Sequence, residues 1–507
     1  MKTQTQTQTQ TQTNTKLPLF KQSKIAVHGL GVSGFKTLEL LKLIKKNFIP
    51  SLEIWAINQG SIESWKKRDE LKELLDEKYW LSEEDPHVPT LFASMDTIIL
   101  APGIPREHPL LQLALKKNIS IWSEIELAYC FCHHPIPPII AVTGSNGKTT
   151  TVTLIQDICI NAGLNPFVGG NIGLPFSEYA IEEINNFKVK KSSKPFDIII
   201  LELSSFQLES IDSFKPNVAI ITNISLTHTE RYKSIEEYAH AKFNISKNMR
   251  KSDSDNDLII YTTASSDVLL NEWASKQDAQ LLKIDSKQIS NIKNEMNKLF
   301  DLSTFKLIGD HNLLNLYSSY KALAHLEISS LKEKLINSVQ MTINNFKAVH
   351  YRSEKIKINE KLPLSVYNDA KSTNLDATQK AIEAVATTAA LTMASETTDI
   401  YLIFGGKKRS ESAGKVWNEV FKSKIKKIFL IGETTDELAD ELQGKISFSK
   451  SYTLDNVIIE IKESLNKKNN KSKISLIFSP GYPSFDQFEN YIKRGEYFEK
   501  IILDAFA

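Results

Sequence analysis

The stretch Ile139–Thr151 reads IIAVTGSNGKTTT and decides the fold of the region around it. It joins an apolar run, Ile139–Val142, to a glycine-rich segment, Gly144–Thr149, and a helix-like segment, Thr150–Ala162. Glycines let the backbone approach an anion, and the N–H groups at a helix N-terminus bind it. In such a loop a lysine reaches the terminal phosphates and a Thr hydroxyl can bind Mg²⁺. The sequence therefore predicts a strand, a phosphate-binding loop with Lys148 as its cation, and a helix.

This loop departs from the standard P-loop, which has a glycine six residues before the lysine. That position is Val142 in this sequence. A glycine-rich turn that merely opens a helix is therefore the alternative interpretation. The order of strand, Gly-Lys-Thr and helix favours phosphate binding over that alternative.

Similar apolar runs recur along the chain, and amphipathic stretches separate them. Several runs end in Gly or Pro and lead into a helix-like period, which is typical of α/β domains with mostly parallel sheets. Ligands bind at the carboxyl ends of the strands in such sheets. The strands predicted in this way are Ile25–Val27, Leu52–Ile57, Thr97–Leu100, Ile139–Val142, Asp197–Leu203, Val218–Ile221, Leu258–Tyr261, Tyr401–Phe404, Ile428–Ile431 and Ile474–Phe478.

Length and composition limit the class of protein. At roughly 100–200 residues per domain, the 507 residues suggest about three domains. The 62 Lys and Arg residues nearly balance the 60 Asp and Glu residues, so we expect no nucleic acid and no anionic membrane as a partner. No apolar run approaches the ~20 residues of a membrane helix, so we expect no membrane insertion. The 3 cysteines fit a reducing compartment and supply neither a disulfide framework nor a zinc site.

Low-complexity and Pro-rich segments predict the domain organisation. Thr and Gln alternate at the start of the chain, so we expect a disordered tail over residues 1–20. The stiff segment His133–Pro138 (HHPIPP) and the change of pattern near Lys347–Arg352 indicate two boundaries. We predict a Rossmann-like domain, a central P-loop-type ATP-binding domain with a parallel sheet, and a Rossmann-like C-terminal domain over residues 21–134, 135–348 and 349–507.

A second glycine loop, GLGVSG (Gly29–Gly34), follows the strand Ile25–Val27. A dinucleotide site also needs an acidic residue at the end of the next strand. That strand ends at Asn58-Gln59 without a carboxylate, so NAD binding is disfavoured. Another anionic ligand at this helix N-terminus, or a plain strand-to-helix turn, remains open.

Several motifs, taken in order, resemble one family. VTGSNGKTTT resembles the ATP-binding loop of the Mur ligases, the ATP-dependent amide-forming enzymes of peptidoglycan precursor synthesis. Each further motif is moderately specific, and the ordered set is very specific. The set comprises GLGVSG (Gly29–Gly34), APGI (Ala101–Ile104), VGGNIGLP (Val168–Pro175), LELSSFQLE (Leu201–Glu209), TNISLTHTERY (Thr222–Tyr232), GDHNLLN (Gly309–Asn315), YNDAKSTN (Tyr367–Asn374) and SPGYPSFDQFENYIKRGEYF (Ser479–Phe498).

The resemblance implies a cytoplasmic, monomeric ligase that adds D-glutamate to UDP-N-acetylmuramoyl-L-alanine. A substrate carboxylate attacks the γ-phosphate of ATP, and the amine of the amino acid then displaces phosphate from the acyl phosphate. Such a reaction depends on cations, here two Mg²⁺ ions, and on ordered donors rather than on a protein nucleophile. The C-terminal SPGYPSFDQF favours D-glutamate, and GLGVSG with APGI favours a nucleotide-sugar domain.

The resemblance also implies catalytic residues and metal ligands. The catalytic residues are Lys148, Asn171, His228 and Lys242. The metal ligands are Thr149, Glu202, His228 and Lys242, the last carbamylated by CO₂. Without the resemblance, Glu202 is equally well a solvated strand-end charge, His228 a surface residue and Lys242 a solvent-facing helix lysine.

Three binding sets follow from the same resemblance. ATP would be bound by Gly144, Ser145, Asn146, Gly147, Lys148, Thr149, Thr150, Asn312, Arg352, Asp369 and Lys371. The UDP-substrate would be bound by Gly31, Val32, Ser33, Gly34, Ala101, Pro102, Gly103 and Asn171. D-Glutamate would be bound by Thr373, Arg409, Ser484 and Phe485.

The sequence departs from the family pattern at three places. Arg409 stands where the family has Lys in Gly-Gly-x-x-Lys-Gly-x-Asp, and the Gly and Asp that follow are absent. Arg and Lys are not interchangeable in such sites, so amino-acid choice is open here. Glu230 stands where we expect Asp, and the position near Asn58 lacks the Asp expected at the uracil end.

Other functions remain open on the sequence. A sister ligase for another amino acid, or an enzyme like folylpolyglutamate synthetase, would share the ATP domain. A non-catalytic scaffold would be expected to lose Lys148, Glu202, His228 or Lys242, and all four are present. A simple NTPase switch would not need the C-terminal motifs.

Overall fold

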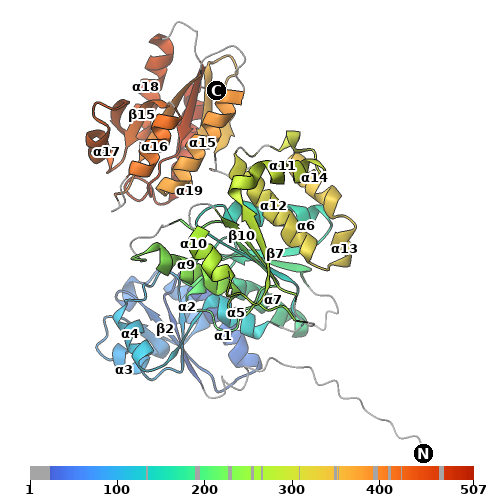
Figure 1. Cartoon of the computed structure of the whole chain (residues 1–507). Coiled ribbons are helices and arrows are strands. Elements are labelled where there is room, and N and C mark those ends of the chain that lie inside the picture. Colours follow the sequence, from blue (N-terminus) through green and yellow to red (C-terminus); the bar gives the residue numbers. More distant parts are fainter. Residues whose placement is uncertain are drawn as a thin grey trace, which may run out of the picture. The chain divides into compact units, whose positions relative to one another are not determined.

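The computed structural model describes residues 23–132, 135–188, 195–225, 231–252, 256–263, 267–305, 307, 309–346, 351, 353–391, 398–408, 413–423, 425–467 and 473–506. Figure 1 shows these residues as α/β structure, with helices beside each of three sheets. The predicted Thr/Gln tail lies outside the described residues, as do His228, Glu230, Arg352 and Arg409.

The first sheet is parallel and has the strand order β3-β2-β1-β4-β5. Its core contains Ala26, Ile57 and Ile98 from three neighbouring strands. The strands are β1 (Lys24–His28), β2 (Glu53–Asn58), β3 (Trp80–Ser82), β4 (Thr97–Leu100) and β5 (Ser120–Ser123). The helices are α1 (Val32–Asn47), α2 (Arg68–Leu74), α3 (Val88–Phe92), α4 (Pro109–Lys116) and α5 (Glu124–Phe131).

The second sheet has the order β11-β10-β9-β6-β8-β7, and its strands from β10 to β7 pair in parallel. Every residue of β6, β8 and β9 is buried, as expected for strands covered on both faces. The strands are β6 (Ile139–Thr143), β7 (Pro166–Gly170), β8 (Ile198–Glu202), β9 (Val218–Ile221), β10 (Leu258–Thr263) and β11 (Gln280–Asp285). The helices are α6 (Lys148–Asn161), α7 (Phe176–Lys188), α8 (Ser205–Leu208), α9 (Ile235–Phe243) and α10 (Asp267–Ala274), followed by α11 (Ile289–Asn297), α12 (Asp310–His325), α13 (Ser329–Lys332) and α14 (Leu335–Asn345).

The third sheet has the order β12-β13-β17-β14-β15-β16, and only the edge pair β12–β13 is antiparallel among its strands. Leu402 and Phe404 of β14 face one apolar core, and Tyr401 and Ile403 face another. Helices therefore cover both faces. The strands are β12 (Glu354–Ile356), β13 (Leu364–Asn368), β14 (Thr398–Gly405), β15 (Ile425–Ile431), β16 (Ser447–Tyr452) and β17 (Lys473–Phe478). The helices are α15 (Leu375–Leu391), α16 (Gly414–Lys422), α17 (Thr435–Leu442), α18 (Leu454–Lys467) and α19 (Tyr491–Phe506).

The chain forms two compact units. The first comprises residues 1–224, 234–284 and 318–338, and the second comprises residues 225–233, 285–317 and 339–507. The first unit holds two sheets because α5 joins them. The carboxylate of Glu126 accepts hydrogen bonds from the backbone N–H groups of Asp212, Ser213 and Phe214, at 2.9, 2.8 and 2.9 Å. The domain ranges 21–134, 135–348 and 349–507 stay predictions.

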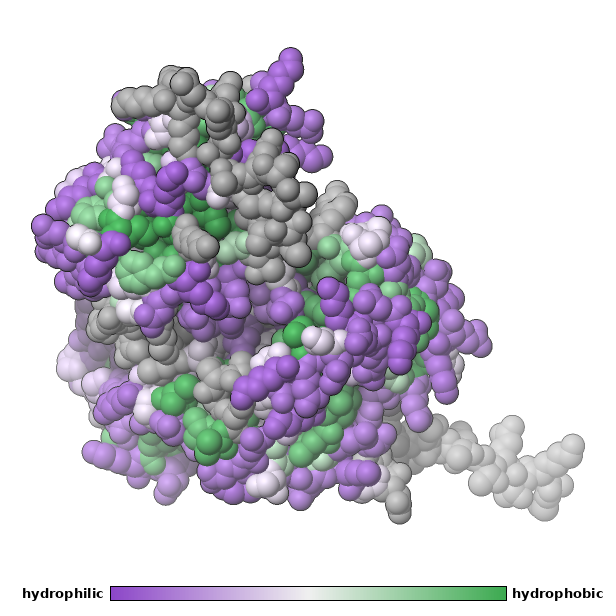
Figure 2. All heavy atoms as spheres, turned by 45° about the horizontal axis from the view of Figure 1, so that its top comes forward, coloured by the Kyte–Doolittle hydropathy of each residue, from purple (hydrophilic) through white to green (hydrophobic). Residues whose placement is uncertain are grey.

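The predicted α/β class is confirmed, and each predicted strand overlaps a strand of the structure. The sequence did not predict β3, β5, β7, β11, β12, β13 and β16. On the face shown in Figure 2, hydrophilic residues cover most of the coloured surface and hydrophobic residues gather in small patches. Among the described residues, no helix combines the length and the apolar character needed to cross a membrane.

Candidate active site

The phosphate loop of the central region takes a backbone shape that two glycines permit. Gly144 has φ +141°, and a Cβ there would lie 2.0 Å from Oγ1 of Thr222. Gly147 has φ 87° and is the N-cap of α6. Both φ values lie where side chains other than glycine are strained. The loop therefore leads from the buried strand β6 into the N-terminus of α6, as predicted.

Lys148 and the residues around it form the body of this loop. Its Nζ donates hydrogen bonds to the backbone oxygens of Gly144 and Ser145, at 2.7 and 2.9 Å. The ammonium group therefore lies against the loop that would receive a phosphate. Thr149 and Thr150, in the first turn of α6, are buried.

A buried carboxylate next to the loop connects three elements. Oε2 of Glu202, at the end of β8, accepts a hydrogen bond of 2.8 Å from the hydroxyl of Thr149. Oε1 accepts a bond of 3.0 Å from Nδ2 of Asn171, which follows β7. The structure thus brings together three residues predicted from separate motifs. Two oxygen ligands 2.8 Å apart fit the edge of an octahedron around Mg²⁺, which is about 3 Å for bonds of 2.0–2.1 Å.

Lys242 on α9 is not the solvent-facing lysine that sequence without the resemblance would favour. Its side chain is buried, with only 1% exposed, and its Nζ lies 4.4 Å from the centre of the Tyr238 ring. Burial lowers the pKa of Lys242 to about 7, although the charge of Glu202 acts in the opposite direction. A large neutral fraction at neutral pH makes this amine chemically competent to react with CO₂. His228, predicted to bind metal beside it, lies outside the described residues.

Two residues that hold the loop were not predicted. Asn223 follows β9, and its Oδ1 and backbone oxygen accept hydrogen bonds from the N–H groups of Asn146 and Ser145, at 3.0 and 2.9 Å. Thr222 donates its hydroxyl to the backbone oxygen of Asn146. Both residues belong to the motif TNISLTHTERY, so their motif was recognised but their role was not.

In the first sheet, the two predicted nucleotide-sugar loops lie side by side. A Cβ on Gly29 would come within 2.6 Å of Cβ of Ala101. Gly34 approaches the other end of its own loop, since a Cβ there would lie 2.0 Å from the backbone oxygen of Gly29. Val32 is exposed, and Asn58 accepts the N–H of Leu30 through Oδ1 at 3.1 Å. Asn58, which replaces an expected carboxylate, therefore supports the loop. Of the other predicted members, Gly31 is the N-cap of α1, Ser33 lies in its first turn, and Pro102 and Gly103 follow β4.

In the second unit, Asp369 follows β13 and is buried. Its Oδ1 accepts the N–H of Ser353 at 3.0 Å, and its Oδ2 accepts the hydroxyls of Ser372 and Ser479. Asp369 thus holds three chain segments together. Nζ of Lys371 lies 5.5 Å from the centre of the Tyr491 ring.

The predicted D-glutamate residues differ in exposure. Ser484 is buried and Phe485 is 69% exposed. Thr373 is partly buried and donates its N–H to the backbone oxygen of Lys371 at 2.9 Å. Asn312 lies in the first turn of α12.

Arg494 is a further residue of this unit that the sequence did not predict. Its guanidinium group is buried, and NH2 donates hydrogen bonds to the backbone oxygens of Ala370 and Tyr482, at 3.1 and 3.0 Å. A Cβ on Gly406 would lie 3.3 Å from NH1. Arg494 therefore lies where three loops with predicted ligand contacts meet. Burial lowers its pKa to about 10, so it remains a cation at neutral pH.

The fold and the loop define a class of nucleotide-dependent enzymes, and comparison with known proteins gives the family. A family model described as the Mur ligase middle domain matches residues 142–323. The UDP-N-acetylmuramoylalanine–D-glutamate ligase of Thermoanaerobacter pseudethanolicus is 31% identical over 507 aligned positions, covering 96% of this chain and 99% of that protein. The chain belongs to the Mur ligase family.

The chain is also similar to a second ligase and to a solved structure. The UDP-N-acetylmuramoylalanine–D-glutamate ligase of Christiangramia forsetii is 31% identical, covering 94% of this chain and 99% of that protein. Among solved structures, the UDP-N-acetylmuramate–alanine ligase of Thermotoga maritima aligns with a TM-score of 0.47 at 16% identity, covering 94% of this chain and 99% of that one.

Proposed function

We propose that this protein uses ATP to join D-glutamate to UDP-N-acetylmuramoyl-L-alanine, a step in the synthesis of peptidoglycan precursors. The observation that carries the proposal is the hydrogen-bonded group of buried Thr149, buried Glu202 and exposed Asn171 beside the phosphate loop of Lys148. The full-length similarity to ligases named for this reaction supports it. We place this activity in the cytoplasm, in a monomer with the three domain ranges predicted above.

In the first step, the carboxylate of UDP-N-acetylmuramoyl-L-alanine attacks the γ-phosphorus of ATP and ADP leaves. Two anions must approach each other, so the site has to supply positive charge and ordered donors. Lys148 would exchange its bonds to two backbone oxygens for bonds to phosphate oxygens. Asn171 would donate to the substrate carboxylate. We propose Gly144–Thr150, Asn312, Arg352, Asp369 and Lys371 as the residues that bind ATP.

Two Mg²⁺ ions would neutralise phosphate charge. Thr149 and Glu202 offer the hard oxygen ligands that this ion prefers. We propose His228 and Lys242 as ligands of the second ion. In that role Lys242 would be a carbamate: the neutral amine adds to the carbon of CO₂, a C–N bond forms, one proton is released and the nitrogen then carries a carboxylate. The burial and lowered pKa of Lys242 support this step.

In the second step, the amine of D-glutamate attacks the acyl carbon, and phosphate leaves as the amide bond forms. Thr373, Arg409, Ser484 and Phe485 would bind D-glutamate. The loops Gly31–Gly34 and Ala101–Gly103 would bind the uridine diphosphate of the other substrate, and their close approach supports one shared pocket.

The test is phosphate release from ATP with UDP-N-acetylmuramoyl-L-alanine and, in parallel, D-glutamate, L-glutamate, L-alanine, L-lysine or no amino acid. We expect release only with D-glutamate, together with an amide product of the corresponding mass. Lys148→Ala should lower the rate about 10²–10³-fold. The control Lys116→Ala, at an exposed lysine of α4, should leave the rate unchanged.

Other outcomes have distinct meanings. Phosphate release with another amino acid would mean that the protein is a ligase with a different amino-acid substrate. Arg409 would then be the first residue to examine. Release without any amino acid would favour a simple NTPase. ATP binding without release under any condition would contradict the proposed ligase and favour a scaffold.

A further inference from the structure

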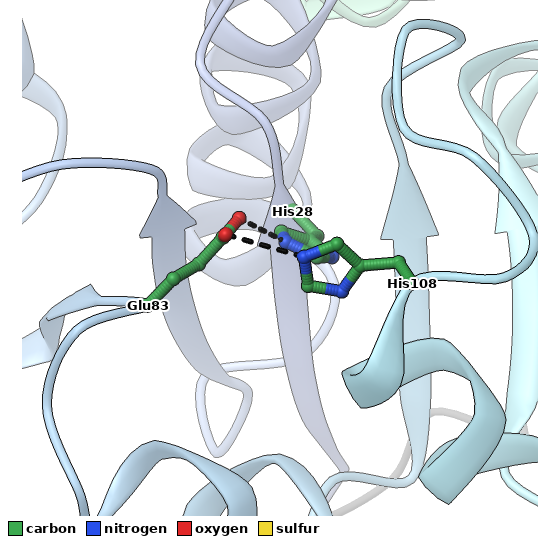
Figure 3. A group of neighbouring side chains, drawn as sticks. All are labelled: His28, Glu83 and His108. Carbon is green, nitrogen blue, oxygen red and sulfur yellow. Dashed lines mark hydrogen bonds and ion pairs between the residues drawn. The ribbon is translucent and has the colours of Figure 1, made fainter.

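Two imidazoles and a carboxylate converge in the first sheet, outside the residues assigned to any substrate. His28 ends β1, Glu83 follows β3, and His108 is the N-cap of α4. Figure 3 shows both rings directed at the two oxygens of Glu83. Residues separated by 55 and 25 positions in the chain thus meet at one point, at the carboxyl edge of a parallel sheet.

The polar atoms of these three residues lie close enough together to reach one metal ion. Nε2 of His28 lies 2.7 Å from Oε1 of Glu83, and Nε2 of His108 lies 3.2 Å from Oε2. One nitrogen or oxygen atom from each residue can be chosen so that all three lie within 4.8 Å of one another. Ligands about 2.0–2.2 Å from a tetrahedral ion are about 3.4 Å apart, so small side-chain shifts would admit an ion.

The surroundings favour a bound ion over a solvated cluster. The side chain of His28 is fully buried, and those of Glu83 and His108 are only 18% and 22% exposed. The ring of Phe92 packs edge-on against His28, with centroids 5.5 Å apart. Nε2 of each histidine faces the Glu83 carboxylate, whereas Nδ1 of neither has a hydrogen-bond partner in the described part of the chain. Imidazole Nε2 and a carboxylate are a donor set that suits zinc and similar transition metals.

We propose that His28, Glu83 and His108 bind a divalent transition-metal ion of the zinc type. The ion ties the end of β1 to the turn after β3 and to the start of α4. His28 directly precedes Gly29, and His108 follows the loop that contains Ala101. The ion would therefore stabilise the positions of both loops of the first sheet. This site is separate from the oxygen ligands Thr149 and Glu202 and does not depend on the proposed ligase activity.

The experiment is Zn²⁺ binding by the full chain, stripped of metal by a chelator and titrated in excess Mg²⁺. The Mg²⁺ occupies oxygen-ligand sites and leaves a histidine site to zinc. We expect one tight equivalent per chain by a competing chromophoric chelator and by elemental analysis, and a rise in the unfolding temperature with Zn²⁺. Co²⁺ in the same site should give the visible absorption of a tetrahedral ion.

Paired variants locate the ion. Glu83→Gln keeps a hydrogen-bond acceptor for the imidazoles but removes the anionic ligand, and His108→Gln changes a partly exposed side chain, so both should fold. Each should weaken Zn²⁺ binding about 100-fold or more. The matched controls Glu84→Gln and His87→Gln, at exposed neighbours, should leave binding within about twofold.

Two results would overturn the proposal. One is the absence of a tight equivalent in the wild-type chain, which would leave the cluster as a hydrogen-bonded clamp. The other is unchanged binding in both Glu83→Gln and His108→Gln, which would place the zinc elsewhere. The three cysteines are buried, and His133 and His134 would then be the next residues to change.

Discussion

Glu202 and Asp369 occupy equivalent places in two different sheets, yet their hydrogen-bond partners differ in kind. Each buried carboxylate lies at the carboxyl end of a parallel strand, Glu202 on β8 and Asp369 directly after β13. Glu202 accepts hydrogen bonds from Thr149 and Asn171, side chains that can turn to a ligand. Asp369 accepts hydrogen bonds from a backbone N–H and two serine hydroxyls, which belong to the chain segments that Asp369 holds together. Position on a strand therefore does not define a carboxylate's role; its partners do.

The largest expected effect is that of Glu202→Gln, which removes the charge and keeps the shape. We expect the ligase rate to fall about 10³-fold or more, since the proposed metal ligand is lost, while the unfolding temperature stays close to that of the wild type. Steady-state kinetics and thermal unfolding on the same preparation measure both. A variant with a lower unfolding temperature and an unchanged ligase rate would show that Glu202 stabilises the fold and does not take part in catalysis.

Lys242→Ala is the second test, because the proposed carbamate would add another anion near Glu202. We expect a rate loss of about 10²–10³-fold that short carboxylic acids partly restore, and a carbamate carbon visible by ¹³C NMR in the wild type. With its pKa near 7, the amine is protonated below that pH and neutral above it. At limiting bicarbonate, activity should therefore rise as the pH increases through 7.

Lys251→Ala, at an exposed lysine, is the control for this prediction and should behave as the wild type. Full activity of Lys242→Ala, or a wild-type rate independent of bicarbonate together with no rescue by acids, would exclude the carbamate.

Asp369→Asn makes the same chemical change as Glu202→Gln and should have the opposite profile. An amide accepts fewer hydrogen bonds than a carboxylate, so we expect a loss of about 2–3 kcal/mol in stability. The KM for ATP should rise severalfold, because Asp369 is proposed to bind ATP and holds Ser372 and Ser479 in position, and kcat should change less. Thermal unfolding and a KM measurement decide this. An unchanged unfolding temperature with a large loss of kcat would show that Asp369 acts like Glu202.

Glu124 is a third buried carboxyl group, and Glu124→Gln should change the stability only slightly, the smallest of these effects. Its carboxyl accepts the backbone N–H of Ser177, and burial raises its pKa to about 7. The folded protein therefore binds a proton that the unfolded chain releases above about pH 4.5. This contribution to stability is complete below pH 4.5 and is lost as the pH rises through 7.

The glutamine variant resembles the protonated form at every pH, so its unfolding temperature should exceed that of the wild type by a few degrees at pH 8 and match it near pH 4.5. Glu126→Gln is the contrasting control: with three N–H groups bound to its carboxylate, it should be less stable at pH 8. A difference at pH 8 that does not shrink toward pH 4.5 would contradict the titration of Glu124.

Strands at the centre of each sheet could be predicted from the sequence, whereas many edge strands could not. β6, β8 and β9 are continuous apolar runs because both of their faces are buried. At the edges, β11 is largely exposed and β16 reads SFSKSY, so neither carries an apolar pattern. These edge strands form because they pair with the adjacent strand of the sheet, and their own sequence gives no strand pattern.

The residues of the candidate site likewise include some that the sequence predicted and some that it did not. Lys148 and Thr149 followed from the chemistry of a glycine loop, and Glu202 followed from its place at a strand end together with the family resemblance. Asn223 and Arg494 act through backbone atoms far away in the chain. Both residues lie in motifs quoted from the sequence, but the sequence does not give their contacts, because those contacts form only once the chain has folded.

The three N–H groups bound by Glu126 have a consequence for substrate choice. They bond the first sheet to the second within one unit, so we expect the separation between the loop at Gly31 and the side chain of Asn171 to vary little. Under the proposed function, the distance between the loop at Gly31 and Asn171 sets the length of the sugar nucleotide that can bind. A sugar nucleotide lengthened or shortened by one ring could not keep its diphosphate at one end and present its carboxylate at the other, so molecular length would be selected before any chemistry begins.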